Sequence, residues 1–254
     1  EYVYKTGTSR KKRVQAGASA KNFIIVMPDA DIENLMPNII GSFFGNAGER
    51  CLAGSVLVTF KENHDKVVNS FVDHAKKLKI GYGMEKDVDM GPLIRREHKE
   101  RVVKYIQIGI DEGAKLILDG RNYKNEKYPN GFFLAPTIFD FVNPDMTIAK
   151  EEIFGPVASI ITTNNFDEAL EIINRSRYGN ASSIYTKSGY YAREFVDRVE
   201  AGNIGINIGV AAPIAFYPFA GMKQSFFGDL HPQGGLDHIL FFTDSKVVIS
   251  RWST

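Results

Sequence analysis

Residues 23–31 read FIIVMPDAD, and this stretch contains the end of a buried strand and the beginning of a helix. The five apolar residues from Phe23 to Met27 are typical of a strand that is covered on both faces. Pro28 and Asp31 then supply turn and N-cap chemistry for a helix that we expect to reach about Phe44. Pro37 lies inside this helix, and because proline cannot donate a backbone hydrogen bond we expect an interruption or kink there.

The same strand and helix pattern continues along the chain. Alternating strands and helices predict an α/β fold, with a mostly parallel open sheet and helices packed on its faces. Expected strands cover residues 55–60, 115–118, 132–142, 158–163, 182–186 and 203–208, and expected helices cover 63–77, 95–112, 167–176 and 190–199. The apolar residues 239–243 and 246–252 follow, and we expect 246–252 to form an exposed edge strand that pairs with another chain.

Composition excludes several classes of function. The 254 residues are 44% hydrophobic, which suffices for a buried core, and the net charge of +1 gives no electrostatic reason to expect nucleic acid or an anionic membrane as a partner. The basic run Arg10 to Arg13 is expected to be a solvated strand end. We find no apolar run of membrane-spanning length and no signal peptide. The single cysteine excludes an internal disulfide and suits a reducing compartment.

The sequence predicts no metal site and no phosphate-binding loop. A zinc site needs closely spaced His or Cys ligands, and a dinucleotide loop needs a glycine-rich GxGxxG run. None of the histidines has zinc-ligand spacing, and no GxGxxG segment occurs. The five histidines are His64, His74, His98, His231 and His238.

Cys51 is the first candidate for a catalytic residue. It lies in GNAGERCLAGS, residues 45–55, between a predicted helix and a predicted strand. Glycines on both sides allow a ligand to approach the backbone, and the positive charge of Arg50 favours the thiolate. The alternative is a buried structural cysteine, because free cysteine is among the most buried residue types.

Three motifs resemble the aldehyde dehydrogenase superfamily, in the same order along the chain. They are FFGNAGERCLAGS at residues 43–55, EEIFGPV at 151–157 and PFAGMKQS at 218–225. The arginine directly before Cys51 is similar to the CoA-acylating methylmalonate-semialdehyde dehydrogenase branch. The resemblance covers almost the whole chain.

The resemblance implies an organisation. Residues 1–22 would end a cofactor-binding domain, 23–225 would form the catalytic domain, and 226–254 would form a C-terminal segment with an oligomerisation strand. Because the family's chains are about twice as long and begin with that cofactor domain, we expect this sequence to be a fragment that is inactive alone. Homo-oligomers are implied through the C-terminal strand. The compartment would be the mitochondrial matrix in a eukaryote and the cytoplasm otherwise.

The resemblance also implies a reaction that proceeds through Cys51. The thiolate would attack an aldehyde, NAD would accept the hydride, and a thioacyl enzyme would remain. Hydrolytic relatives carry a glutamate in Glu-Leu-Gly-Gly-Lys that activates water. Here the matching segment is GASAK, residues 17–21, and Gly17 stands in the place of that glutamate. CoA is therefore expected to accept the acyl group, and the products would be propionyl-CoA or acetyl-CoA, CO2 and NADH, as in valine catabolism.

Five further residues receive roles from the resemblance. Arg50 would bind the carboxylate of malonate or methylmalonate semialdehyde, since arginine recognises carboxylates bidentately. Glu152 would bind the nicotinamide ribose and Phe154 would pack on the nicotinamide ring. Asn207 would lie near the substrate, and Lys21 would either support the structure near Cys51 or be a surface lysine.

Two alternatives stay open from the sequence. A hydrolytic aldehyde dehydrogenase with another base is disfavoured by Gly17 and Arg50. The other alternative is an inactive module whose function is self-association through the C-terminal strand. An activity assay separates the enzymes from the module, and a requirement for CoA separates the two enzymes.

Overall fold

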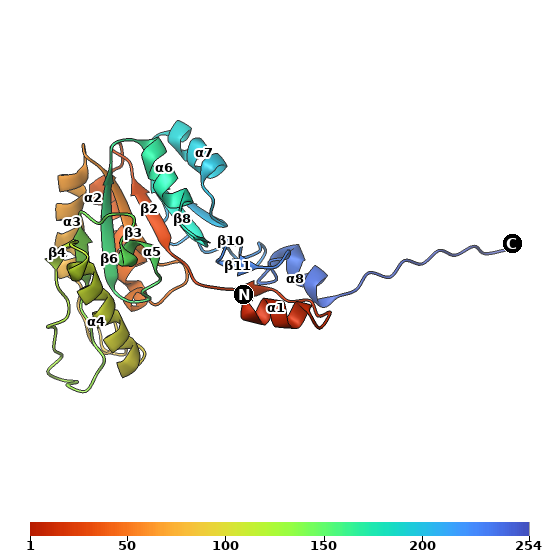
Figure 1. Cartoon of the computed structure of the whole chain (residues 1–254), viewed down its shortest axis with the longest axis horizontal. Coiled ribbons are helices and arrows are strands. Elements are labelled where there is room, and N and C mark those ends of the chain that lie inside the picture. Colours follow the sequence, from red (N-terminus) through yellow and green to blue (C-terminus); the bar gives the residue numbers. More distant parts are fainter. Residues whose placement is uncertain (254) are drawn as a thin grey trace.

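A seven-stranded sheet lies at the centre of the computed structural model, which describes residues 1–253 (Figure 1). The strand order is β4-β5-β6-β3-β2-β8-β9, and every pair is parallel except β4 with β5. The predicted mostly parallel sheet is confirmed. The strands are β2 (Asn22–Val26), β3 (Gly54–Phe60), β4 (Lys115–Leu118), β5 (Thr137–Asp140), β6 (Val157–Thr163), β8 (Ala181–Tyr185) and β9 (Asn203–Ile206).

Helices cover both faces of this sheet. The crossover from β2 through α2 to β3 runs in one direction along the sheet, and that from β6 through α6 to β8 runs back, so right-handed connections place α2 and α6 on opposite faces. Helix α2 packs on α3, where the Phe71 ring lies 5.1 Å from Phe43 and 5.6 Å from Phe44. The helices are α2 (Ile32–Phe44), α3 (His64–Lys76), α4 (Arg96–Asp111), α5 (Thr147–Lys150), α6 (Phe166–Asn174) and α7 (Gly189–Arg198).

Two local expectations from the sequence were wrong. Helix α2 continues through Pro37, because the proline is on the exposed side while Met36, Ile39 and Ile40 anchor the helix in the core. The strand expected over 132–142 is shorter and covers only Thr137–Asp140. Pro136 precedes it and cannot donate to a ladder, and Phe141 ends it with a φ of 51°.

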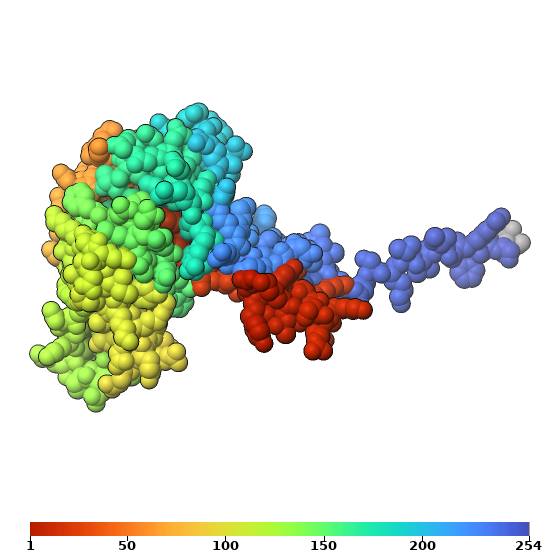
Figure 2. All heavy atoms as spheres, in the orientation of Figure 1, coloured from red at the N-terminus to blue at the C-terminus, as the bar shows by residue number. Residues whose placement is uncertain are grey.

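The first and last parts of the chain pack together beside the main body (Figure 2). Helix α1 (Tyr2–Thr8) is followed by the basic run, which turns at Lys11 (φ 60°) and is not the strand end that the sequence predicts. Arg13 donates to the carbonyls of Leu240 (3.2 Å), Phe241 (2.9 Å) and Thr243 (2.6 Å), at the end of helix α8 (Gly235–Phe242). The arginine therefore satisfies carbonyls that the helix end leaves free.

One short ladder joins the terminal parts to each other, and a second joins the last part to the main body. β1 (Ala16–Gly17) pairs with β11 (Phe226–Phe227), and β10 (Met222–Lys223) pairs with β7 (Tyr178–Gly179). The domain boundaries expected after residues 22 and 225 stay predictions.

Residues 243–253 have no regular secondary structure and project away from the body (Figure 1). The strand expected over 246–252 is not formed within this chain, because a strand needs a neighbour to satisfy its backbone. The apolar side chains of this segment, including Val247, Ile249 and Trp252, are exposed. Self-association through it stays a prediction. Within residues 1–253 no helix is both long and apolar enough to cross a membrane.

Candidate active site

Residues of the first two sequence motifs gather at the amino-terminal edge of the parallel strands. Cys51 precedes β3, the segment 17–21 precedes β2, and Glu152 and Phe154 precede β6. Ligands of open α/β sheets usually bind at the opposite, carboxyl edge. Because parallel strands begin at the same edge, these three segments come together although they are far apart in the chain.

Cys51 has a rigidly held backbone and an exposed side chain. Its carbonyl oxygen accepts hydrogen bonds from the Nδ2 atoms of Asn22 (2.8 Å) and Asn180 (2.7 Å). Both asparagines are buried, whereas Cys51 is exposed. The interpretation of Cys51 as a buried structural cysteine is therefore wrong, because the thiol is open to a reagent from outside.

The two asparagines are themselves fixed, and the sequence reading missed them. Asn22 also donates to the carbonyl of Ala53 (2.8 Å) and accepts from the N–H of Ala181 (3.1 Å). The backbone carbonyl of Asn180 accepts from the Nδ2 of Asn203 (2.9 Å). The sequence did contain a signal for these residues. An asparagine begins or directly precedes each of the apolar strands β2, β8 and β9.

The loop that leads to Cys51 turns through three residues with positive φ. They are Asn46 (56°), Ala47 (54°) and Gly48 (71°), within the short helix η1 (Gly45–Gly48). This left-handed conformation is costly for residues other than glycine and is found at functional sites. A Cβ atom on Gly48 would lie 2.4 Å from the carbonyl oxygen of Gly155, so the cysteine loop and the EEIFGPV loop touch through their backbones.

Helix α4 holds the EEIFGPV loop in place. Arg101 donates to the carbonyls of Glu152 (2.8 Å) and Ile153 (2.9 Å). The Nε2 atom of His98 lies 2.6 Å from the carbonyl oxygen of Phe154 and 3.2 Å from Oε1 of Glu49. Burial raises the pKa of the Glu49 carboxyl, and the neighbouring His98 counteracts this. His98 thus links the residue before Arg50 to the loop that carries Phe154.

Glu152 and Phe154 lie in the loop that precedes β6. Glu152 accepts a hydrogen bond at Oε1 from the N–H of Ala20 (3.1 Å), which connects it to the segment before β2. Phe154 has a φ of 59° and is 38% exposed, so its ring is available to a ligand. Both residues share a cavity of about 20 Å³ with Arg50. Their roles toward NAD stay predictions.

Arg50 points back to the end of α2. Its Nη2 atom donates to the carbonyls of Gly41 and Ser42, the latter at 3.2 Å, and its Nε atom is buried with no partner among the described residues. Burial lowers the pKa of the guanidinium, and Cys51 opposes that shift. Within the described residues, Glu49 is paired with His98 and not with Arg50. The role of Arg50 toward a substrate carboxylate stays a prediction.

Lys21 is a buried lysine, so the expectation of a surface lysine was wrong. The residue is 3% exposed, and its Nζ atom has no hydrogen-bond partner within residues 1–253. Burial lowers the pKa of Lys21 to about 7, although the charges of Glu152 and Glu151 counteract the shift. An amine of this kind gains or loses its proton near neutral pH.

The structure does not bring Asn207 to Cys51. Asn207 follows β9 and therefore lies at the carboxyl edge of the sheet, opposite the edge where Cys51 lies. Its amide is fully used in bonds to Thr186, accepting from the N–H (2.9 Å) and donating to the carbonyl (3.0 Å). The role of Asn207 toward a substrate stays a prediction, and its position at the opposite edge of the sheet does not support it.

The third motif has a supporting position. Ser225 donates from Oγ to the carbonyl of Ser19 (2.7 Å) and accepts from the N–H of Gly179 (3.1 Å). Lys223 pairs with Glu200 (2.7 Å) and donates to the carbonyl of Asn174 (2.6 Å). PFAGMKQS therefore ties the segment before β2 to the segment before β8.

Gly17 lies in β1 and is exposed. No atom lies within 4 Å of the position that a Cβ would occupy there. The glycine is therefore not required by packing, and a longer side chain can be placed at residue 17.

Comparisons with known proteins agree with this geometry. The sequence model of the aldehyde dehydrogenase family matches residues 1–248. The chain belongs to the aldehyde dehydrogenase family. It is 50% identical over 252 residues to malonate-semialdehyde dehydrogenase 2 of Geobacillus kaustophilus strain HTA426, covering 99% of this chain and 52% of the relative.

Solved structures agree as well. The methylmalonate-semialdehyde dehydrogenase of Oceanimonas doudoroffii superimposes with a TM-score of 0.96 and 41% identity, over 100% of this chain and 52% of that chain. A Sinorhizobium meliloti 1021 protein in complex with NAD has the same TM-score of 0.96, with 42% identity over 100% of this chain and 52% of that chain. The chain therefore spans about half the length of the relatives that it matches.

Exchange of Gly48 for alanine tests the contact between the two loops. Gly48→Ala places a Cβ against Gly155 in a left-handed conformation, and we expect the free energy of unfolding to fall by about 1 to 3 kcal/mol. Gly41→Ala is the matched control. Gly41 lies inside α2 with open space around it, so alanine there should raise stability by about 0.5 to 1 kcal/mol. Urea unfolding of both variants measures the difference, and equal effects would contradict the contact.

Exchange of Lys21 for methionine tests the buried amine. Folding lowers the pKa of Lys21 from 10.5 to about 7. Between these two pH values the lysine is protonated in the unfolded chain and neutral in the folded chain, so the unfolded chain binds one more proton. Stability from this group therefore rises with pH in that window, by about 2 kcal/mol between pH 7 and 9. Lys21→Met should abolish this rise in urea unfolding, and the exposed Lys104→Met should retain it. A rise of equal size in both variants would contradict the assignment.

Proposed function

We propose that Cys51 is the covalent nucleophile of an NAD-dependent, CoA-acylating dehydrogenase for malonate or methylmalonate semialdehyde. One observation carries the proposal: two buried amides hold the backbone of Cys51, the residue is exposed, and the neighbouring Arg50 lines a cavity with Glu152 and Phe154. The semialdehyde dehydrogenases among the relatives support the substrate class. Because the chain spans about half of their length, the activity is that of the whole enzyme.

The first step is the attack of the Cys51 sulfur on the aldehyde carbon. This attack forms a carbon–sulfur bond and moves the carbonyl electron pair onto oxygen, which gives a thiohemiacetal. The backbone N–H of Cys51 can donate to that oxygen, since the hydrogen bonds from Asn22 and Asn180 fix the orientation of the residue. Bound NAD would supply the hydride acceptor, and loss of the hydride from the former aldehyde carbon would leave an acyl group on Cys51.

Glu152 and Phe154 are the residues of this chain that would hold the nicotinamide end of NAD. The carboxylate of Glu152 can accept hydrogen bonds from ribose hydroxyls. The Phe154 ring is exposed, and aromatic rings pack well against other rings. The support of this loop by His98 and Arg101 limits its movement, so both groups keep their place relative to Cys51.

The acyl group is released by a second thiol. The sulfur of CoA attacks the acyl carbon, and the bond to the Cys51 sulfur breaks, which regenerates the thiolate. Loss of CO2 from the substrate's carboxylate leaves an electron pair that takes up a proton, so that acetyl-CoA or propionyl-CoA is formed.

Hydrolysis is disfavoured because the nearby carboxylates already have partners. Glu49 pairs with His98, Glu151 accepts from the hydroxyl of Tyr105 (2.6 Å), and Glu152 accepts from Ala20. A general base must reach the water that it activates. With glycine at residue 17, water has no positioned base, and CoA is the better nucleophile.

Cys51→Ser tests the nucleophile. Because serine is far less nucleophilic than a thiolate and Cys51 is the only cysteine, we expect the variant to lose acyl-enzyme formation completely. Rapid mixing of the active enzyme with semialdehyde and NAD, without CoA, measures the burst of NADH. An unchanged burst in the variant would sink the assignment.

Gly17→Glu tests why the enzyme needs CoA. The exchange places a carboxylate where hydrolytic relatives have their base, and the open space at Gly17 can hold it. General bases contribute about 10²- to 10⁴-fold, so deacylation by water should rise by at least about tenfold. Turnover without CoA is the measurement, with Gly17→Gln as the control of equal size that cannot act as a base. No gain of glutamate over glutamine would show that the missing base does not limit hydrolysis.

Arg50→Leu tests recognition of the substrate's carboxylate. Loss of a hydrogen bond between charged groups costs about 1.5 to 3 kcal/mol, so kcat/KM for the semialdehyde should fall by about 10- to 100-fold. Propanal has no carboxylate and should be affected far less. Because Arg50 also supports the end of α2, thermal unfolding of the variant serves as a control. Equal losses on both substrates would assign Arg50 to the activation of Cys51 instead.

A further inference from the structure

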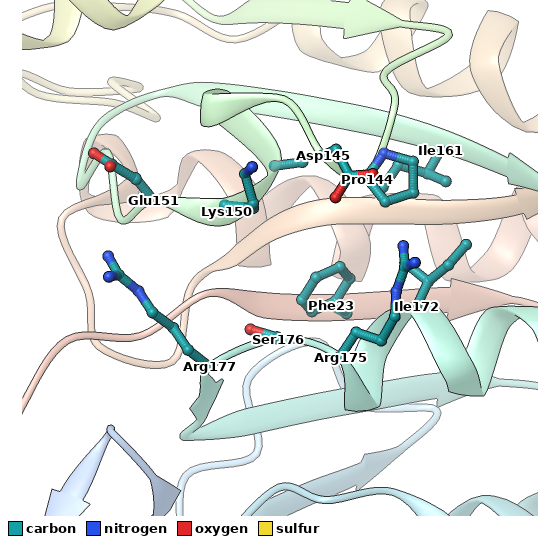
Figure 3. Close-up of a pocket in the computed structure, with 11 residues that line it drawn as sticks. Phe23, Pro144, Asp145, Lys150, Glu151, Ile161, Ile172, Arg175, Ser176 and Arg177 are labelled. Carbon is teal, nitrogen blue, oxygen red and sulfur yellow. The ribbon is translucent and has the colours of Figure 1, made fainter.

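A cleft of about 260 Å³ lies between α5 and α6, apart from the small cavity beside Cys51 (Figure 3). Its floor and one wall are apolar, and its rim is cationic, with side chains that reach in from both sides in Figure 3. The apolar residues include Phe23, Ile161 and Ile172, and the cations are Lys150, Arg175 and Arg177.

The three cationic head groups have no carboxylate partner within residues 1–253, as the ion pairs of the structure involve other residues. Arg177 lies over the ring of Tyr178, with 4.8 Å between its guanidinium carbon and the ring centroid. Two carboxylates also line the cleft. Glu151 is already bonded to the hydroxyl of Tyr105 (2.6 Å), and Asp145 is exposed. The three cations and two carboxylates of the lining leave the cleft with a net charge of +1.

Each side of the cleft continues directly into residues around Cys51. Phe23 on the floor follows Asn22, whose Nδ2 atom lies 2.8 Å from the Cys51 oxygen. Arg177 on one wall is three residues before Asn180, whose Nδ2 atom lies 2.7 Å from the same oxygen. Three residues of extended chain span at most about 10 Å. The cleft thus adjoins the backbone that holds the nucleophile.

We propose that this cleft binds the phosphate-bearing end of CoA, so that the flexible arm of CoA leads its thiol along the amino edge of the sheet to Cys51. The choice of CoA rests on the proposed function. Arginine and lysine are the residues that bind phosphate groups, and the apolar floor favours an organic phosphate over inorganic phosphate. The cleft is smaller than most pockets for whole ligands, of about 300 to 1,000 Å³, and suits one part of a long cofactor.

Calorimetric titration of the full chain tests the ligand. CoA, pantetheine and inorganic phosphate are the three probes. CoA should bind at least tenfold more tightly than either of the others, because only CoA combines phosphates with an organic body. Since exposed charges are screened by salt, CoA binding should also weaken when the ionic strength is raised from about 0.05 to 0.5 M. No binding of CoA, or equal binding of CoA and pantetheine, would overturn the proposal, and equal binding of phosphate would reduce the cleft to a simple anion site.

Charge-removing variants test the location. Arg175→Gln and Arg177→Gln should each weaken CoA binding by about tenfold, the loss expected for one charge-assisted contact. Lys104→Gln, at an exposed position of α4 outside the cleft, is the matched control and should leave CoA affinity unchanged. Thermal unfolding checks that Arg177→Gln still folds, since it loses its contact with Tyr178. Unchanged CoA affinity in both arginine variants would place CoA elsewhere.

The outcome for the cleft can be separated from the outcome for the reaction. If the active enzyme requires CoA for turnover but the arginine variants keep their CoA affinity and their KM for CoA, the cleft assignment fails and the proposed function stands. If turnover needs no CoA at all, the proposed function fails whatever the chain binds. In the supported case, bound CoA also slows alkylation of Cys51 by iodoacetamide in the full chain, and the two arginine variants lose this protection at the same CoA concentration.

Discussion

Two buried asparagine amides donate hydrogen bonds to one backbone carbonyl, that of Cys51. The rest of the site depends on this interaction. A carbonyl oxygen has two lone pairs, and Asn22 and Asn180 use both. Buried amides that lose their partners cost about 1 to 3 kcal/mol each, so neither asparagine is free to turn away. Cys51 is held through its backbone by residues at the beginnings of two strands of the sheet. The sulfur therefore stays exposed while the backbone beneath it is rigid.

This arrangement explains why the site lies at the amino edge of a parallel sheet. The loops that enter β2, β3, β6 and β8 meet there. Their backbones come into direct contact, as those of Gly48 and Gly155 do. Helix α4 then stabilises the outermost loop from the side through His98 and Arg101. At the opposite, carboxyl edge, the amide of Asn207 is bonded to the backbone of Thr186.

Cationic groups gather around this edge at a cost to stability. Burial disfavours the charged form of Lys21 and lowers the pKa of Arg50, whose Nε atom has no partner among the described residues. Groups with perturbed pKa values and incomplete hydrogen bonding concentrate at functional sites. The substrate carboxylate, the thiolate and the phosphates of the proposed ligands are all anions, and a positive edge stabilises each of them.

Much of this protein follows from the sequence alone. The apolar run at Phe23 to Met27 and the alternation after it predict the sheet, since burial on both faces leaves few other structures for such residues. The local motifs also identify Cys51, Glu152 and Phe154, because each needs only its own neighbours to be recognised. Their meeting at one edge follows from the parallel order of the strands.

Tertiary structure decided what depends on contacts between distant residues. The two asparagines are 158 positions apart in sequence, and only the pairing of β2 with β8 brings both amides to Cys51. Lys21 is an ordinary lysine in the sequence, and the surrounding fold makes it a buried amine. Asn207 resembles a site residue, but the direction of β9 places it at the far edge. Sequence determines which side chains are present, whereas burial, charge and approach between segments arise only when the strands are assembled.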